Sequence, residues 1–365
     1  YSLFRTMKIS PYIFRNYDIR GKADVDLDEA KVEAIGRAYA TYLQKRRIYE
    51  IVVGHDARLS SESYSQAFIK GVTETGIDVI DIGLVMTQMF YFAQYRFQTN
   101  GGVMITASHN PFQYNGFKMA TGYSVNTTHD EVQELRRMVE ADDFYQSKTI
   151  GTVRQEDVKE DYFHDVLKRV KIEQKFKIVV DGHHGTTGLY NPELLRRAGC
   201  EVIEVMSEPD GHFPAGTPDP TDAKILTDLA ELVKEHKADL GMMFDGDGDR
   251  IGVVDDSGHI FWNDVLIALF AQEILERSPG AKIVYNTLCS QVVPEVVKKN
   301  GGIPIMWRVG YPFIKEKMVE VGAAFGGELS GHFFFKDNTY GHDDGTFAAV
   351  RILEYLSEKK MTLSQ

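Results

Sequence analysis

The fold is decided by the stretch Val103-Met104-Ile105-Thr106-Ala107-Ser108-His109-Asn110-Pro111. Its first three residues are apolar and favour a β-strand, which runs directly into a loop of small and polar residues. In α/β sheets, ligands bind beyond the carboxyl ends of the strands, so this loop is a candidate site. The Ser108 hydroxyl can act as a nucleophile if His109 or a nearby lysine manages its proton. The alternative is a simple strand-ending turn, with Asn110-Pro111 as its turn dipeptide.

On either side of this stretch, short β-branched runs alternate with longer helical patterns, which predicts α/β domains. The strands predicted most clearly lie at 51–54, 79–83, 103–105, 178–180, 202–205, 240–244, 283–285 and 303–307. A polar segment at 142–161 separates the first group of elements from the second. The element order is similar in three successive groups, which indicates internal duplication.

Length and composition exclude several classes of protein. The chain has 365 residues, 43% of them hydrophobic and 26% charged, the mix of a soluble globular protein with two or three domains. Its formal net charge of −12 argues against nucleic-acid and membrane-surface partners, but not against a small phosphorylated substrate bound by local basic residues. Cys200 and Cys289 lack the spacing of zinc or redox motifs, which favours a reduced, cytoplasmic setting. The sequence does not predict an oligomeric state.

A second motif is Asp245-Gly246-Asp247-Gly248-Asp249-Arg250, which follows an apolar strand. Glycines let the backbone curl so that the three carboxylates converge, and such hard oxygen ligands suit Mg²⁺ or Ca²⁺. An EF-hand loop is excluded, because Arg250 and Asp256 stand where that loop needs glycine and glutamate. The remaining alternative is a solvated acidic turn. Arg250 would add a positive charge suited to a phosphoryl oxygen.

Three further features are weaker when each is taken alone. Gly326-Gly327-Glu328-Leu329-Ser330-Gly331-His332 is a glycine-rich loop whose polar groups suit sugar hydroxyls, or a plain hairpin. Phe14-Arg15-Asn16-Tyr17-Asp18-Ile19-Arg20-Gly21 offers Arg20 as an anion clamp, or as half of a surface ion pair with Asp18. Lys118 is a solvated surface charge by default, but burial beside Ser108 would lower its pKa and let it move a proton.

Together, the four motifs resemble those of the α-D-phosphohexomutase family, in its phosphomannomutase/phosphoglucomutase branch. The order is the family's order: N-terminal signature (14–21), phosphoserine loop (106–111), metal-binding loop (245–250) and sugar-binding loop (328–332). The resemblance implies three related mixed-sheet α/β domains around a central cleft, at 1–152, 153–256 and 257–365. It also implies a fourth, smaller domain with a basic phosphate-gripping loop. No such loop precedes Gln365, so we expect that domain to be absent from this chain.

The resemblance further implies a phosphohexomutase that interconverts hexose 1-phosphate and hexose 6-phosphate, with mannose or glucose as the sugar. Phosphorylated Ser108 would give its phosphoryl group to the sugar phosphate, and the resulting 1,6-bisphosphate would return the other one. The implied cofactors are Mg²⁺ and, as activator, glucose 1,6-bisphosphate or mannose 1,6-bisphosphate. The implied catalytic residues are Ser108, Lys118, Arg20 and His109, the substrate-binding residues Tyr17, Arg250, Glu328, Ser330 and His332, and the metal ligands Ser108, Asp245, Asp247 and Asp249.

Two departures from the family pattern keep alternatives open. Tyr311 stands where this branch often has a histidine, and the segment Asn286-Thr287-Leu288-Cys289 lacks its usual lysine. A phosphoglucosamine mutase is one alternative, although Leu329 fits the hexose branch better. The other is a non-catalytic phosphosugar-binding relative, which the intact Ser108 loop and acidic motif disfavour.

Overall fold

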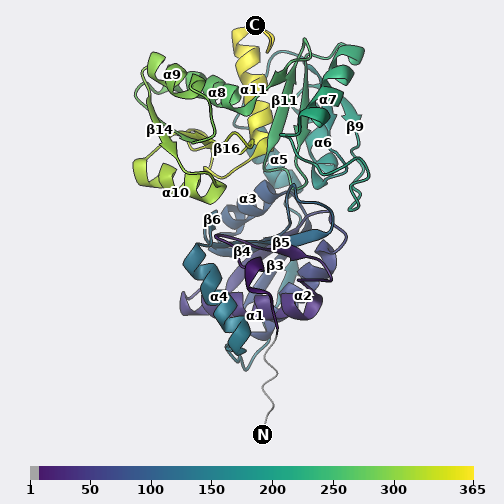
Figure 1. Ribbon diagram of the computed structural model, residues 1–365, viewed down its shortest axis with the longest axis vertical. Coiled ribbons are helices and arrows are strands. Elements are labelled where there is room, and N and C mark those ends of the chain that lie inside the picture. Colours follow the sequence, from purple (N-terminus) through teal and green to yellow (C-terminus); the bar gives the residue numbers. More distant parts are fainter. Residues whose placement is uncertain (1–7) are drawn as a thin grey trace. The chain divides into compact units, whose positions relative to one another are not determined.

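The computed structural model describes residues 8–365 of the chain. These residues form two compact units: 8–159 with 210–217, and 160–209 with 218–365 (Figure 1). Within the described part of the chain, no helix is both long enough and apolar enough to cross a membrane.

The first unit is built on one mixed sheet with the strand order β1-β5-β4-β2-β3-β7, and β6 pairs with β5. The strands are β1 (Ile19–Lys22), β2 (Glu50–His55), β3 (Asp78–Leu84), β4 (Gly101–Ile105), β5 (Tyr114–Gly122), β6 (Val125–Asn126) and β7 (Val153–Gln155). Strands β4, β2, β3 and β7 are parallel, whereas β5 runs antiparallel to β4. The predicted strands at 51–54, 79–83 and 103–105 are confirmed. Strand β5 has no counterpart among the predicted elements, because its glycines and polar residues break the alternating pattern.

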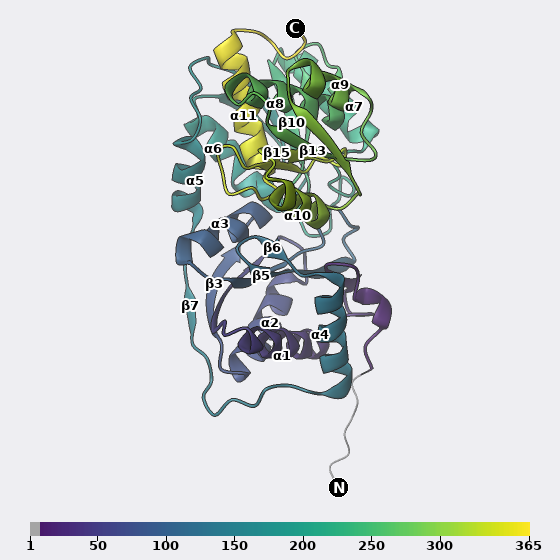
Figure 2. The same ribbon diagram turned by 90° about the vertical axis from the view of Figure 1, so that its left-hand side faces the viewer.

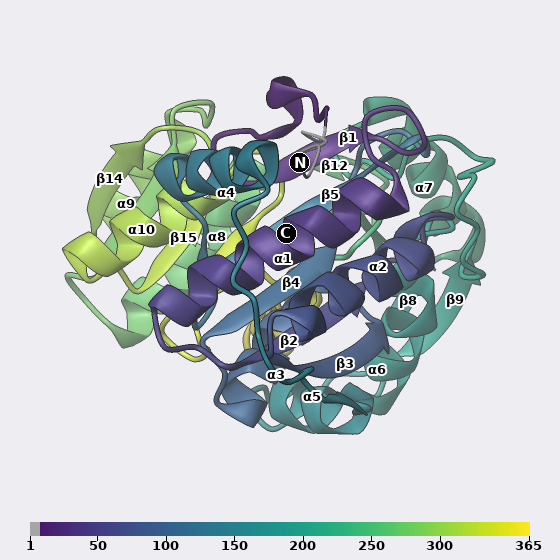
Figure 3. The same ribbon diagram turned by 90° about the horizontal axis from the view of Figure 1, so that it is seen from below.

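Helices cover both faces of this sheet (Figures 2 and 3). Helices α1 (Glu29–Lys45), α2 (Ser61–Glu74) and α4 (His129–Ala141) lie on one face, and α3 (Thr87–Phe97) lies on the other. Fully buried apolar residues of these elements form the core between the sheet and helices α1, α2 and α4; examples are Ile35, Phe68, Ile51 and Val103. Thr128 caps α4 in a capping box with Glu131, which fixes where that helix begins.

The second unit contains two sheets. The five-stranded sheet has the order β12-β11-β10-β8-β9. Its strands are β8 (Lys177–Asp181), β9 (Glu201–Val205), β10 (Leu240–Phe244), β11 (Ile251–Asp255) and β12 (Ile260–Phe261). Its helices are α5 (Lys159–Leu167), α6 (Asn191–Arg197) and α7 (Ala223–His236). Helix α7 buries an apolar stripe, including Leu226, Leu229 and Val233, against this sheet.

The four-stranded sheet has the order β14-β13-β15-β16. Its strands are β13 (Lys282–Asn286), β14 (Ile303–Trp307), β15 (Phe325–Gly327) and β16 (Phe333–Phe335), and its helices are α8 (Asn263–Arg277), α9 (Val292–Lys299) and α10 (Tyr311–Val321). Helix α11 (Gly345–Lys359) lies between the two sheets of this unit (Figure 1). Its Arg351 is fully buried and pairs with Glu273 of α8 at 2.9 Å, which ties α11 to α8.

Candidate active site

The Ser108 loop starts where β4 ends, near the middle of the first sheet. Ser108 has φ of +51°, a left-handed conformation that is uncommon for a residue other than glycine. Its amide donates a hydrogen bond to Oγ1 of Thr106 at 2.9 Å. The Ser108 side chain is buried, and its Oγ lies 3.3 Å from Nδ1 of His109. The hydroxyl therefore has an imidazole nitrogen beside it, and the Ser108 amide is fixed by a hydrogen bond.

Arg20 reaches the same loop from the edge strand β1. Its Nη1 donates to the carbonyl of Ala107 at 3.1 Å and to Oδ1 of Asn110 at 2.9 Å. Its Nε lies 2.8 Å from the buried carboxylate of Asp18. The alternative reading of Arg20 and Asp18 as a surface pair is therefore wrong, because both side chains are buried.

Lys118 shares a sheet face with Arg20. Ile19 and Phe117 are paired across β1 and β5, and both point into the apolar core. Because side chains alternate along a strand, Arg20 and Lys118 point to the opposite face. Lys118 is only 1% exposed, so it is not the solvated surface charge that its residue type favours by default. Tyr17 is half-buried, and its carbonyl accepts a hydrogen bond from Thr127 at 3.0 Å.

The acidic loop follows β10, near the middle of the five-stranded sheet. Asp245, Asp247 and Asp249 are all fully buried, and one oxygen of each lies within 4.8 Å of the others. Oδ1 of Asp245 also accepts the amides of Gly248 and Arg250, which curls the loop; Gly248 has φ of +86°. Three buried carboxylates this close repel one another unless a cation lies among them. The donor set, all carboxylate oxygen, fits Mg²⁺, and these residues could hold it.

A second turn of the same unit supports the acidic loop. The amide of Thr186 donates to the carbonyl of Gly246 at 2.9 Å. A Cβ on Gly185 would lie 3.0 Å from Cα of Gly246, so glycine permits this close approach. The two loops therefore lie at the same edge of the sheet, beyond the carboxyl ends of β8 and β10.

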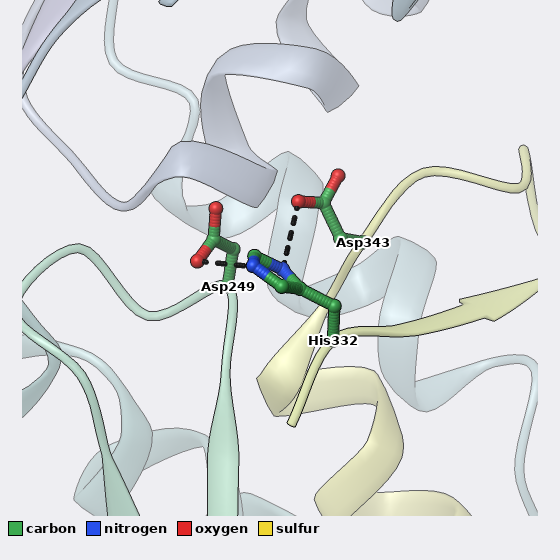
Figure 4. Close-up of side chains that lie close together, drawn as sticks. All are labelled: Asp249, His332 and Asp343. Carbon is green, nitrogen blue, oxygen red and sulfur yellow. Dashed lines mark ion pairs between the residues drawn. The ribbon is translucent and has the colours of Figure 1, made fainter. Parts of the chain in front are cut away.

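Arg250 and His332 connect the acidic loop to the glycine-rich loop at 326–332, within the second unit. Nε of Arg250 donates to Nε2 of His332 at 3.0 Å. Nδ1 of His332 lies 3.1 Å from Asp343 and 3.8 Å from Asp249, so the ring stands between two carboxylates (Figure 4). Nε2 of His332 therefore accepts from Arg250, while Nδ1 faces the two carboxylates.

Glu328 is held by groups from two other segments. Its Oε1 accepts from Nδ2 of Asn286 at 3.2 Å and from the amide of Gly310 at 2.8 Å. Glu328 is buried, whereas Ser330 is half-buried at the turn of the loop. The fixed carboxylate and the nearby hydroxyl are suited to accept and donate hydrogen bonds to a polyhydroxylated ligand.

Asp343 and Tyr311 lie next to His332, and Lys315 lies beside both of them. No motif pointed to Asp343 or Lys315, whereas Tyr311 was noted in the sequence as a departure from the family pattern. The Tyr311 ring stacks on His332 with a centroid distance of 5.3 Å. Nζ of Lys315 lies 5.6 Å from the centre of that ring and 3.7 Å from Asp343. Asp343 could have been suspected from the paired acids just before a helix, but Lys315 reads as an ordinary helix-surface lysine.

Two titratable neighbours of Asp343 have shifted pKa values. Burial lowers the pKa of His342 to about 3, so its imidazole is neutral at physiological pH. Burial raises the pKa of Asp344 to about 7, although its hydrogen bond with the Phe347 amide at the start of α11 acts in the opposite sense.

These three sheets and their loops define an α/β protein with a serine loop, an acidic loop and a polar glycine-rich loop. Models of phosphoglucomutase/phosphomannomutase α/β/α domains I, II and III match residues 11–146, 160–258 and 262–365. The chain belongs to the phosphoglucomutase/phosphomannomutase family.

Individual relatives agree with this assignment. A phosphomannomutase/phosphoglucomutase of Pseudomonas aeruginosa is 40% identical over 346 residues, which cover 95% of this chain and 74% of the relative. A phosphoglucomutase of Neisseria meningitidis is 39% identical over 345 residues, covering 94% and 75%. The crystal structure of a family protein from Burkholderia thailandensis superposes with a TM-score of 0.92 at 37% identity, covering 96% of this chain and 78% of that one.

Proposed function

We propose that the protein is a phosphohexomutase that interconverts the 1-phosphate and 6-phosphate of mannose, glucose or both. The observation that carries the proposal is the Ser108 loop: a buried serine hydroxyl in a left-handed backbone conformation, with His109 at 3.3 Å and Arg20 bonded to the same loop. The imidazole and the buried arginine beside this hydroxyl favour a functional loop over a simple strand-ending turn. The named relatives act on the same class of substrate.

In the proposed reaction, the phosphoryl group of phosphoserine 108 passes to the free hydroxyl of the sugar phosphate. The Ser108 Oγ–P bond breaks, a new sugar O–P bond forms, and the hydroxyl proton moves to Lys118 or His109. The resulting 1,6-bisphosphate then reorients, so that its other phosphoryl group faces Ser108 and is returned to it. Glucose 1,6-bisphosphate or mannose 1,6-bisphosphate would prime the unphosphorylated protein.

The remaining residues have proposed roles in binding. Glu328 and Ser330 bind sugar hydroxyls, with His332 beside them, and Tyr17, Arg20 and Arg250 bind phosphoryl or sugar oxygens. Asp245, Asp247 and Asp249 would hold Mg²⁺, which neutralises charge on the transferring phosphoryl group. The expectation that phosphoserine 108 is a further ligand of this ion remains a proposal. We also propose a cytoplasmic location and domains at 1–152, 153–256 and 257–365.

One assay tests the reaction and its competitors. The protein is incubated with Mg²⁺, a trace of glucose 1,6-bisphosphate and, separately, mannose 1-phosphate, glucose 1-phosphate or glucosamine 1-phosphate. We expect conversion of a hexose 1-phosphate to its 6-phosphate; conversion of glucosamine 1-phosphate alone would identify the glucosamine alternative. If no sugar is turned over and intact mass detects no phosphate on Ser108, the proposal is wrong and a binding role replaces it.

A further inference from the structure

Arg58 is a buried residue to which no motif assigned a function, and it donates hydrogen bonds to three carbonyls of the Ser108 loop and to the first carbonyl of β5. Its Nη2 donates to the carbonyls of Ser108 and Asn110, both at 2.7 Å. Its Nη1 donates to the carbonyls of Pro111 and Tyr114, at 2.9 and 3.0 Å. A planar guanidinium presents its N–H groups in a rigid fork, so it holds these carbonyls in one fixed arrangement.

The amide side of Ser108 is fixed by a second set of contacts that begins two residues before Arg58. Oδ2 of Asp56 accepts from the Thr106 hydroxyl at 2.7 Å, and Oγ1 of Thr106 in turn accepts the Ser108 amide. Oδ1 of Asp56 accepts the Arg58 amide at 3.0 Å and the Ser61 hydroxyl. The Asp56 carboxylate also lies 3.2 Å from Nε of Arg58.

One buried ion pair, Asp56 with Arg58, thus holds both backbone groups of Ser108: Asp56 holds the amide through Thr106, and Arg58 binds the carbonyl directly. This explains how a non-glycine residue is kept at φ of +51°. Rotating Ser108 into an ordinary conformation would break hydrogen bonds on both sides, and each buried bond to a charged group contributes about 1.5–3 kcal/mol.

A short segment from elsewhere in the chain braces Arg58. Residues 210–217 lie within the range matched by domain II, yet they pack in the first unit. The Arg58 guanidinium lies over the ring of Phe213, 5.1 Å from its centroid. The backbone approaches so closely that a Cβ on Gly211 would lie 2.6 Å from the amide nitrogen of Leu59.

We propose that Arg58 is a positioning residue for phosphoryl transfer: it sets the direction in which Ser108 presents its hydroxyl, and residues 210–217 hold Arg58 in place. The inference rests on the proposed function, because it assigns the hydroxyl's orientation to a reaction at Ser108. Misplacing a reacting atom by about 1 Å costs on the order of 100-fold in rate.

The test variant is Arg58→Lys, which keeps the positive charge but removes the planar guanidinium with its several N–H donors. The matched control is Arg351→Lys, because Arg351 is also buried, pairs with carboxylates and lies 4.8 Å from the centre of the Phe335 ring, in the other unit. Each protein is phosphorylated with glucose 1,6-bisphosphate and Mg²⁺, and its phosphoserine content is measured by intact mass. Single-turnover transfer to glucose 1-phosphate and mannose 1-phosphate is then followed by rapid quench, per phosphoserine.

We expect Arg58→Lys to transfer at least about tenfold more slowly per phosphoserine than the unsubstituted protein. Arg351→Lys should unfold at a lower temperature but transfer within about twofold. Normalising to phosphoserine removes the effect of a smaller folded fraction, so a merely structural role would not slow Arg58→Lys. Equal slowing in both variants, or none in Arg58→Lys, would overturn the proposal.

Hydrogen exchange supplies a readout that does not need activity. We expect amides of 106–114 to exchange at least about tenfold faster in Arg58→Lys and unchanged in Arg351→Lys. If Arg58→Lys does not fold, Phe213→Leu decides: about threefold slower transfer and faster exchange in 106–114 support the bracing, and unchanged values refute it. If even the unsubstituted protein transfers nothing, the proposed function fails, and the exchange data still decide whether Arg58 holds the loop.

Discussion

The Ser108 loop and the Asp245–Arg250 loop occupy equivalent places in their sheets but are stabilised in opposite ways. Each follows a strand near the middle of its sheet, β4 or β10. In the first, buried arginines from other segments donate hydrogen bonds to the backbone carbonyls and so stabilise the loop without a bound ion. In the second, three fully buried carboxylates lie together, and Arg250 is 3.9 Å from Asp245. The loop proposed to transfer a phosphoryl group is held in place by hydrogen bonds from other side chains, whereas the carboxylates of the acidic loop repel one another, and a bound cation would relieve that repulsion.

The largest expected effect is the loss of activity in Ser108→Ala. Turnover should fall on the order of 1,000-fold or more, because the phosphoryl carrier is gone, while the unfolding temperature stays the same. The assay is the hexose 1-phosphate conversion, with intact mass to follow phosphorylation.

Ser124→Ala is the matched control, because Ser124 is also buried in a left-handed conformation, with φ of +53°. It should keep its activity and its phosphate. If Ser108→Ala remained active, the Ser108 loop would not carry the transferred phosphoryl group, and the contrast between the two loops would no longer hold.

A smaller effect is expected from Glu328→Gln, which tests whether the second unit binds the sugar as well as a cation. The KM for hexose phosphate should rise about tenfold, because a hydrogen bond to a charged acceptor contributes about 1.5–3 kcal/mol. Single-turnover phosphorylation of Ser108 by saturating bisphosphate should change less.

Steady-state kinetics with mannose 1-phosphate and glucose 1-phosphate measure this change, with the exposed Glu320→Gln as control. Unchanged KM values for both sugars would remove Glu328 from the sugar-binding set.

The smallest effect concerns stability and distinguishes the two loops most directly. Without divalent cations, Asp247→Asn should be more stable than the unsubstituted protein by on the order of 1 kcal/mol, because one of three mutually repelling charges is gone. With Mg²⁺ the order should reverse, because the variant binds the ion more weakly and gains less from it.

Thermal unfolding with and without Mg²⁺ measures both signs, and Asp255→Asn, a buried carboxylate outside the cluster, should show no such reversal. In the protein without a phosphate on Ser108, amides of 106–114 should exchange at the same rate with and without Mg²⁺. If the variant is less stable in both conditions, the acidic loop is stabilised by the protein's own groups rather than by a cation, as the Ser108 loop is.

The agreement between sequence and structure is best where a pattern is local. Strands β4 and β10 and the loops that follow them were predicted from short runs of residues, because an apolar run and the turn after it lie next to each other in the chain. Strand β5 escaped prediction even though it carries Lys118, since Gly116 and its polar neighbours break the alternation. Its place is set by pairing: a Cβ on Gly116 would lie 2.2 Å from the carbonyl oxygen of Ile19.

The sequence alone determined the chemistry available to this protein: a serine loop, three carboxylates separated by glycines, and a polar loop, in the order of a phosphohexomutase. Residue type and spacing are enough for that, because each motif brings its own groups together. Only the tertiary structure decided which remote side chains hold those groups in place. Arg58 bonds to a loop about fifty residues away and Asp343 lies beside His332 and Asp249. Such contacts depend on how strands pair and helices pack, and nothing in the local sequence records them.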